Sequence, residues 1–436
     1  MKNQPLSLLF LALLLTLRSR AADPAAPEPR IAITAELVSQ LVAEAKGRNP
    51  ALEAAAARAE AASEAVSAVR QWEDPVVTVG LWVPGPGGFT AAEMGNLVYG
   101  VEQKLPLFGN PQARRQVAEV AAAREKLVVS DETEKLRRDL TAGLVGLALA
   151  DETVALAREE VAWLDATVTA IDQRYRVGKS SQVDWLKAKT ERAKATNQLA
   201  TARLEVDHEQ AQVNRLLNRD LASAWPAVAL PAIAGAVPYD DRLVGAALDF
   251  APRLKVMQQE TAWNAANARL TGHLRKPEIG VGLAARQYTG DGEFREATMS
   301  VDFSVPWLNG KHYDADVRRD HARMRAAERD AEDYALEIRN QLHQLTTDVD
   351  AARRQAILYR DEIIPLAEQT LSSAQAAWVS NLGLFQDILD ARRTLVEDRE
   401  ALDQAIAGQW RELADVTLLT GIADLPAFSL GSTGTH

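Results

Sequence analysis

Hydrophobic and polar positions follow two different periods along this chain. Between residues 111 and 176, apolar side chains return every seven residues, which is the spacing of a coiled-coil helix. These positions are Leu140, Leu147, Val154, Val161, Val168 and Tyr175. In other stretches of about ten residues the pattern alternates one by one, as it does in strands. The pattern therefore predicts a mainly helical chain with a small β part.

Four segments carry the strand-like alternation and predict strands at about 75–83, 97–105, 277–288 and 297–305. In the first of them, Val77, Val79 and Leu81 share one face, whereas Thr78 and Gly80 share the other. Apolar residues facing small or polar ones fit a membrane-barrel strand with lipid outside and water inside. A half-buried soluble hairpin alternates identically, so the strands alone leave both alternatives open.

The sequence is written twice, with matching residues about 200 positions apart. The matches include Pro75 with Pro277, Pro106 with Pro306, and Asp184 with Asp387. Each half reads as helix, two strands, long helix and helix, and the prolines at 226, 231 and 238 mark the linker between the halves. We expect a first structural repeat at 22–236, a second at 237–425 and a flexible C-terminal tail at 426–436.

The first 21 residues have the layout of an export signal. Lys2 supplies the positive end, residues 6–17 form an apolar run, and Ser19 and Ala21 are the small residues of a cleavage site. The sequence therefore predicts a signal peptide at 1–21 and an exported protein. Cysteine is absent, which excludes disulfides and lipidation on an N-terminal cysteine.

Helix lengths indicate an extended shape. We expect first helices at about 35–70 and 241–273, and a long helix at about 111–176, which makes a rod of about 100 Å at 1.5 Å per residue. In each half the shorter helix before the strands and the helix after the tip turn could stack end to end as a second rod. Four strands cannot close a membrane barrel, which needs about eight, so chains would have to pool their strands.

Candidate chemistry is sparse. A net charge of -11 argues against nucleic acid as a partner. The six histidines show no tight ligand spacing, and neither a phosphate-binding loop nor a nucleophile elbow occurs. We therefore assign no catalytic residue, no metal site and no cofactor.

Several motifs resemble those of the TolC-like outer-membrane efflux channel family, and in particular its branch serving metal-cation and drug pumps of the resistance-nodulation-division type. The matching segments are Asn49-Pro50, Asp74-Pro75, residues 103–109 (QKLPLFG), and the tips 175–188 and 378–391. The resemblance implies a homotrimer with a twelve-stranded outer-membrane barrel, continued by a twelve-rod α-helical tunnel through the periplasm. It also implies a periplasmic adaptor and an inner-membrane pump as partners. Relatives with an acylated N-terminal cysteine differ from this chain, which resembles the unlipidated members.

The resemblance also suggests roles for residues at the tips. Asp387 and Asp390 match the family's acidic positions, and in the first repeat Asp184 is kept whereas Lys187 stands at the second position. Six carboxylates from three chains would form a gate and selectivity ring for cations. The alternative is that acidic residues here only favour a helix N-terminus. Adaptor contacts are expected at the two tips: Tyr175, Gly178, Lys179, Trp378, Leu382 and Gly383.

Two prolines, Pro106 and Pro306, follow the second strand of each half. Because proline cannot donate to a sheet and suits a helix start, we expect barrel-to-tunnel junctions there.

The sequence thus predicts the outer-membrane exit duct of a tripartite efflux system, which passively conducts metal cations or small toxic compounds and is not an enzyme. Two alternatives remain: a periplasmic structural or tethering coiled coil without a channel, and a TolC-like duct serving protein secretion.

Overall fold

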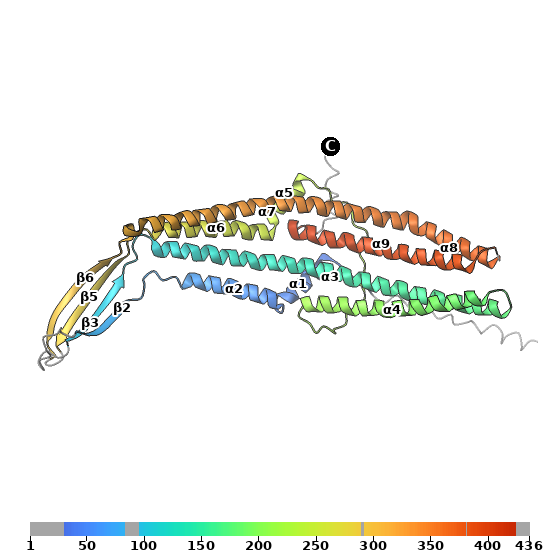
Figure 1. Cartoon of the computed structure of the whole chain (residues 1–436), viewed down its shortest axis with the longest axis horizontal. Helices are drawn as coiled ribbons and strands as arrows, with labels where there is room; N and C mark the ends of the chain where they lie inside the picture. Colours follow the sequence, from blue (N-terminus) through green and yellow to red (C-terminus); the bar gives the residue numbers. More distant parts are fainter. Residues whose placement is uncertain (1–29, 83–95, 289–291, 381, 424–436) are drawn as a thin grey trace, which may run out of the picture.

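The computed structural model describes residues 30–82, 96–288, 292–380 and 382–423. The predicted signal peptide at 1–21 and the tail at 426–436 lie outside the described residues. The described part is an elongated molecule, with a sheet at one end, two helical hairpin tips at the other, and long helices running between them (Figure 1). This is the mainly helical architecture with a small sheet that the sequence predicts.

The two halves share the order of two short helices, two strands, a long rod and a tip helix. The first half contains β1 (Ile31–Ala32), α1 (Ala35–Lys46), α2 (Pro50–Ser67), β2 (Val76–Trp82), β3 (Asn96–Lys104), α3 (Asn110–Arg176), α4 (Gln182–Leu216) and β4 (Val228–Ala229). The second half contains α5 (Asp241–Phe250), α6 (Pro252–His273), β5 (Ile279–Tyr288), β6 (Phe294–Phe303), a 3-10 turn (Pro306–Asn309), α7 (Gly310–Leu358), a π turn (Tyr359–Ile363), α8 (Ile364–Val379) and α9 (Phe385–Thr420).

The first helix of each half is broken where the sequence predicts a continuous one. In the first half the break lies between α1 and α2, where Asn49 caps α2 and Pro50 opens it. In the second half Ala251 separates α5 from α6, and Pro252 opens α6. Proline lacks a backbone N–H and clashes with the preceding turn, so it begins a helix more readily than it continues one. The Asn49-Pro50 motif therefore marks the start of α2 after the break.

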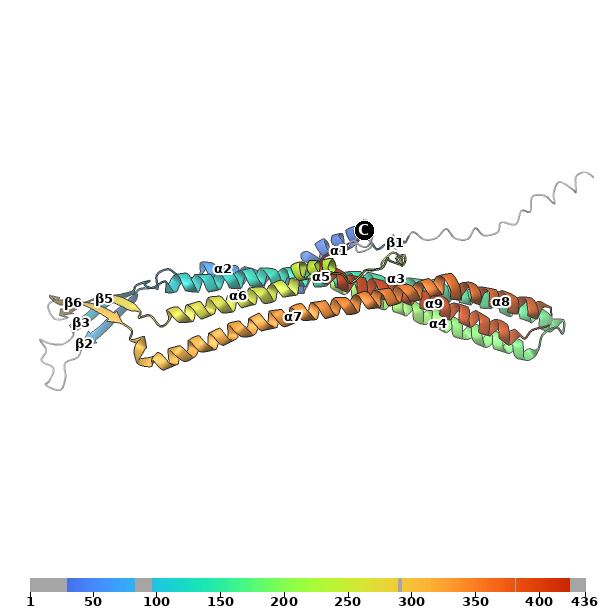
Figure 2. The same cartoon turned by 90° about the horizontal axis from the view of Figure 1, so that it is seen from above.

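Four rods lie side by side to form a helical wall. α2 and α4 run end to end along α3, whereas α6 and α9 run end to end along α7 and α8 (Figures 1 and 2). α3 also packs against α6 and α9, which joins the two halves. The order across the wall is thus α2/α4, α3, α6/α9 and α7/α8.

α3 is the central helix and carries one apolar stretch. It contains an 18-residue stretch that is long and apolar enough to cross a membrane, and 44% of this stretch is buried within the structure. Leu140 and Leu144 pack against α1 and the end of α4, and Leu147 packs against Val228 of the linker. Packing within the wall therefore explains its apolar character.

The two long rods differ at one point. α3 is a continuous helix of 67 residues, whereas α7 and α8 are joined by the five-residue π turn. Pro365 lies at the start of α8, where its missing N–H leaves one carbonyl of the preceding turn without its normal helical donor. A wider turn accommodates such a residue without ending the helix.

The four-stranded sheet is antiparallel with the order β2-β3-β5-β6, and β1 and β4 form a separate parallel pair. Val77 pairs with Val101, Val101 with Leu283, and Leu283 with Met299, so that one row of apolar side chains crosses all four strands. The neighbouring row contains Val79, Tyr99, Ala285 and Ala297. The register therefore places the apolar positions of all four strands on the same face.

This apolar face is exposed, because the exposed fractions of Val77, Leu283 and Met299 are 69%, 57% and 78%. The opposite face is small and polar. A Cβ atom on Gly282 would lie 2.5 Å from the Ser300 hydroxyl, and one on Gly100 would lie 3.1 Å from the Ala284 Cβ atom. Thr298, Ser300 and Asp302 on this face are exposed as well. An apolar face that no helix covers is the reverse of what is found in a sheet that covers a soluble core.

Asn49 should stabilise the junction between α1, α2 and α4. Its carboxamide oxygen accepts from the N–H groups of Ala51 and Leu52, and its amide donates to the Leu216 carbonyl over 2.8 Å. We predict that Asn49→Ala lowers the free energy of unfolding by about 1–2 kcal/mol, since a helix cap and a tertiary bond are lost together.

Hydrogen exchange of the Ala51 and Leu52 amides, measured in detergent, tests this prediction. Both amides should exchange faster in Asn49→Ala. In the matched variant Asn49→Asp they should keep their protection, because aspartate retains the accepting oxygen and loses only the donor. Equal protection in the wild type and the Ala variant would show that the cap is unimportant.

Candidate functional site at the helix tips

The α3–α4 turn is shaped by a left-handed glycine. Gly178 has φ +73°, and the Lys179 N–H donates to the Arg174 carbonyl over 2.8 Å. In the α8–α9 turn the N–H groups of Leu382 and Gly383 both donate to the Ala377 carbonyl. The six predicted contact residues all lie at these two turns, at the end of the molecule opposite the sheet (Figure 1).

Aromatic side chains brace the two tips and connect them. Tyr175 stacks on Trp185 with 6.3 Å between ring centroids, and Trp378 lies 5.9 Å from Phe385. The Arg174 guanidinium sits 4.1 Å above the Trp378 ring and so joins the first hairpin to the second.

Around this brace the tips expose an apolar surface that is large for two turns. The exposed fraction of Leu382 is 86%, and that of Val177 is 67%. The other large exposed apolar residues at this end are Val183, Leu186, Val379 and Leu384. Contiguous exposed apolar residues are characteristic of surfaces that bind another protein.

Asp184 and Asp387 occupy equivalent places at the starts of α4 and α9. Asp184 forms a capping box with Ser181, in which the carboxylate accepts from the Ser181 N–H and the Ser181 hydroxyl accepts from the Asp184 N–H. The Asp387 carboxylate accepts from the Leu384 N–H over 3.1 Å. Helix capping is therefore a physical role that both carboxylates already fulfil.

Asp390 is different, because its partners are side chains. Gln386 donates to its carboxylate over 2.9 Å, and Arg393 approaches to 3.9 Å. The oxygen of Gln386 in turn accepts from Lys187 over 2.9 Å, so that Lys187 of α4 is connected to Asp390 of α9. Lys187 and Asp390 are the repeat-equivalent residues that differ in charge, and the structure links them across the two tip helices.

Sequence reasoning missed a buried basic residue, Arg392, which is 6% exposed. It donates to Glu160 over 2.6 Å and to Glu159 over 3.1 Å, and its guanidinium lies 5.2 Å from the Trp163 ring centroid. Arg392 stands between Ile388 and Leu395 at helical spacing, on the apolar stripe of α9. A charge on an apolar stripe was the signal that could have identified it.

A second missed feature is an acidic region between α9 and α3. Burial, together with Glu152 and Glu400, raises the pKa of Asp403 to about 6, although Arg30 and Arg399 oppose the shift. Burial, reinforced by Glu397, also raises the pKa of Glu400. Arg30 forms an ion pair with Glu152 and is the basic residue that the N-terminal segment brings to this region.

The opposite end of the wall contains the two predicted junctions. After β3, Pro106 leads to Phe108 and Gly109, whose φ angles of +58° and +77° turn the chain into α3. The Phe108 carbonyl lies 2.8 Å from Nδ1 of His273 and thereby ties this turn to the end of α6. After β6, Pro306 is buried and opens the 3-10 turn before α7. Both prolines therefore stand between a strand and a long helix.

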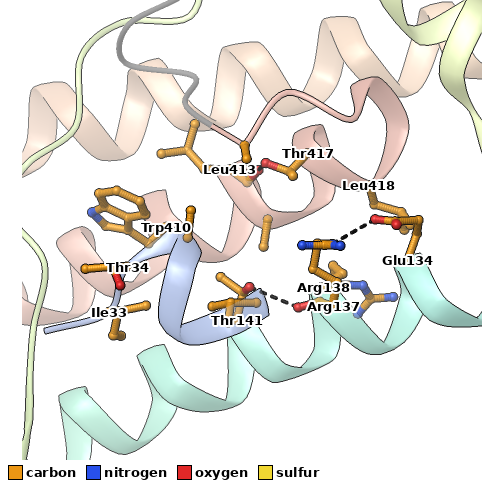
Figure 3. A pocket seen from close by; sticks show the side chains of 14 residues that line it. Ile33, Thr34, Glu134, Arg137, Arg138, Thr141, Trp410, Leu413, Thr417 and Leu418 are labelled. Carbon is orange, nitrogen blue, oxygen red and sulfur yellow. Dashed lines mark hydrogen bonds and ion pairs between the residues drawn. The ribbon is translucent and has the colours of Figure 1, made fainter. Parts of the chain in front are cut away.

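A cavity of about 90 Å³ lies midway along the wall, between the start of α1, α3 and the end of α9 (Figure 3). Apolar residues including Ile33, Trp410 and Leu413 line one side, and Arg137 and Arg138 line the other. Arg138 is paired with Asp415 over 3.2 Å. Among the described residues no group of three or more His, Cys, Asp or Glu side chains could hold a metal ion.

Comparison with known proteins agrees with these features. Residues 41–219 match the family model described as outer membrane efflux protein. The cobalt-zinc-cadmium resistance protein CzcC of Cupriavidus metallidurans is 22% identical over 302 residues, which are 68% of this chain and 70% of the relative.

Solved structures share the fold over most of the chain. The outer-membrane channel OprN gives a TM-score of 0.77 at 18% identity, covering 88% of this chain and 90% of that one. The channel-forming protein CusC gives 0.75 at 14% identity, covering 88% and 92%. These matches confirm the resemblance to TolC-like outer-membrane efflux channels, through the family model over residues 41–219 and through the shared fold.

The acidic region predicts a pH-dependent stability. Since the folded-state pKa of Asp403 lies above the usual value of about 4, the folded protein binds the extra proton between those pH values, and stability falls as pH rises through this window. We predict that Asp403→Asn raises the thermal midpoint at pH 7.5 and leaves it unchanged at pH 4.

Thermal unfolding followed by circular dichroism at both pH values measures this difference. Asp330→Asn, an exposed carboxylate on α7, is the matched control and should behave like the wild type at both. An Asp403→Asn midpoint equal to that of the wild type at pH 7.5 would contradict the assignment.

Proposed function

We propose that this chain is the outer-membrane exit duct of a tripartite efflux system, in which three copies form one channel. The observation that carries the proposal is the sheet, whose four apolar strand faces coincide and are exposed at one end of a helical wall about 100 Å long. Three copies supply twelve strands and twelve rods, enough for a closed barrel continued by a helical tunnel.

The apolar face of the four-stranded sheet is compatible with lipid, and its opposite, more polar face is compatible with water. The second face carries Glu102, Arg286, Glu296 and Asp302 among mostly small or polar residues, with Val76 and Val98 among its larger apolar ones. Alternation of this kind places the polar residues along an aqueous lumen once the sheet is closed. On this account Pro106 and Pro306 lie at the periplasmic membrane surface and the tips reach into the periplasm, as required of an exported protein with residues 1–21 as its signal.

The partners follow from the two ends. The exposed apolar surface at the tips, with Leu382 and Gly383 in one turn and Gly178 and Lys179 in the other, supports docking to a periplasmic adaptor. An inner-membrane pump of the resistance-nodulation-division type would supply the energy, because this chain has no assigned catalytic residue. Similarity to CzcC supports metal cations as the cargo, in preference to small toxic compounds.

Asp390 is the residue on which a cation gate depends most. Asp184 and Asp387 accept backbone N–H groups, so capping accounts for their position, whereas Asp390 is held only by side chains. Three copies would gather these carboxylates at the narrow periplasmic end and raise the local negative potential.

Planar-bilayer recordings test the duct and its gate together. The wild type should form a cation-preferring channel, and Asp387→Asn/Asp390→Asn should lower the cation-to-anion permeability ratio several-fold. Asparagine keeps an oxygen for the Leu384 N–H, so the cap survives while the charge is lost. Glu332→Gln on α7 removes one exposed carboxylate elsewhere and should change nothing.

An unchanged permeability ratio in the double variant would reject the gate. A protein that stays soluble without detergent and forms no channel would instead favour the periplasmic tethering coiled coil.

A further inference from the structure

The two tip helices α4 and α9 are equivalent residue by residue. α4 begins at Gln182 and α9 at Phe385, and in each helix the aspartate that caps its start stands two residues later. Each α4 position therefore corresponds to the α9 position 203 residues further on (Asp184 to Asp387). The two helices share one fold position but differ in their neighbours: α4 packs on α3, whereas α9 packs on α3, α7 and α8.

This difference in neighbours changes which side chains are buried. Leu389 of α9 is 6% exposed, and its equivalent Leu186 in α4 is 49% exposed. Ala407 is fully buried, and its equivalent Leu204 is 69% exposed. α4 thus presents to solvent an apolar face that the same fold buries in the second half.

The long rods show the complementary difference. On α3, Trp163 is partly buried beneath the Arg392 guanidinium at the contact with α9. Its equivalent on α8, 203 residues later, is Leu366, which is 61% exposed. The face of α8 that is equivalent to the α9-binding face of α3 is therefore exposed to solvent.

Charge follows the same equivalence. In the contact within the chain, Arg392 donates to Glu159 over 3.1 Å and to Glu160 over 2.6 Å, and of these two acidic positions only that of Glu159 is acidic again 203 residues later. The equivalent of Arg392 is Lys189 on α4, and the equivalent of Glu159 is Glu362 in the π turn before α8, both of them exposed. The signs of the Arg392–Glu159 pair are thus kept in Lys189 and Glu362, although these two residues lie on helices at opposite edges of the wall.

We propose that α8 of one copy packs on α4 of the next copy in the arrangement that α3 and α9 adopt within one chain. In this seam Leu366 lies against Leu186, and Glu362 pairs with Lys189. The inference rests on the proposed channel of three copies and specifies which residues hold its helical part together. Because the two faces are different surfaces of one chain, repeated contacts close into a ring or continue as a fibre.

Another copy of this chain is favoured over an unrelated partner for this face. The proposed seam pairs an apolar with an apolar residue and a basic with an acidic one. In addition, the equivalent positions on α3 and α9 are already in contact within one chain. Of the exposed apolar residues at the tips, Leu186 is assigned to this seam, and the surface proposed for the adaptor is limited to the turns around Gly178 and Leu382.

The chain contains no cysteine, so paired cysteines report the seam directly. We predict that Leu186→Cys/Leu366→Cys, oxidised or treated with a short bismaleimide in outer-membrane vesicles, gives covalent dimers and trimers on a denaturing gel. The matched control is Lys187→Cys/Leu366→Cys, because residue 187 stands one position further on α4 and faces about 100° away. The control should give at least ten-fold less cross-linked product.

The charge pair provides a second measurement. Lys189→Glu should weaken the trimer in detergent, and adding Glu362→Lys should restore it. The mass of the detergent-solubilised complex is recorded on the same samples. A trimer whose Leu186 and Leu366 cysteines do not link, or link no better than the control pair, would overturn the seam while leaving the channel proposal standing. A monomer in detergent would overturn both.

Discussion

The exposed apolar face of the four-stranded sheet is the constraint on which the rest of the structure depends. The register aligns the apolar positions of β2, β3, β5 and β6 in common rows, and no helix of the described chain packs on those rows, since Val77, Leu283 and Met299 remain more than half exposed. Such a face is costly in water, and the edge strands β2 and β6 offer backbone groups for further pairing. Lipid around the sheet and further copies at its edges remove both costs, and this is the basis of the channel proposal.

The helical wall, like the sheet, has edges that a single copy leaves uncovered. Each strand leads through a short junction into a rod, so whatever closes the sheet also sets the spacing of the rods. Within the chain, α3 contacts the helices of both halves and contains an 18-residue apolar stretch. At the edges of the wall the equivalent contacts have no counterpart in the described chain: Leu186 and Leu366 are exposed where Leu389 and Trp163 are covered. The internal duplication thus indicates which helix contacts at the edges of the wall are missing in a single copy.

Much of this architecture is encoded in short-range patterns. The seven-residue period predicts the long helix, and the alternation predicts strands, because both follow from which face is buried. The broken first helices were not predicted, although Asn49-Pro50 is a cap followed by a proline and could have indicated the break. Pairing of distant side chains is harder to foresee. Arg392 and Glu160 are 232 residues apart in sequence, and only the packing of α9 on α3 brings them together. The roles of Asp387 and Asp390 remain predictions, and the structure adds a capping role for the first.

The number of chains in the membrane-extracted particle tests the central claim most directly. Native mass spectrometry of the protein released from detergent micelles would measure it, against a mass of 47.5 kDa for the 436-residue chain. The account predicts a particle of three chains that persists on dilution, because an open four-stranded sheet leaves its edges and apolar face unsatisfied. A stable monomer under the same conditions would contradict it.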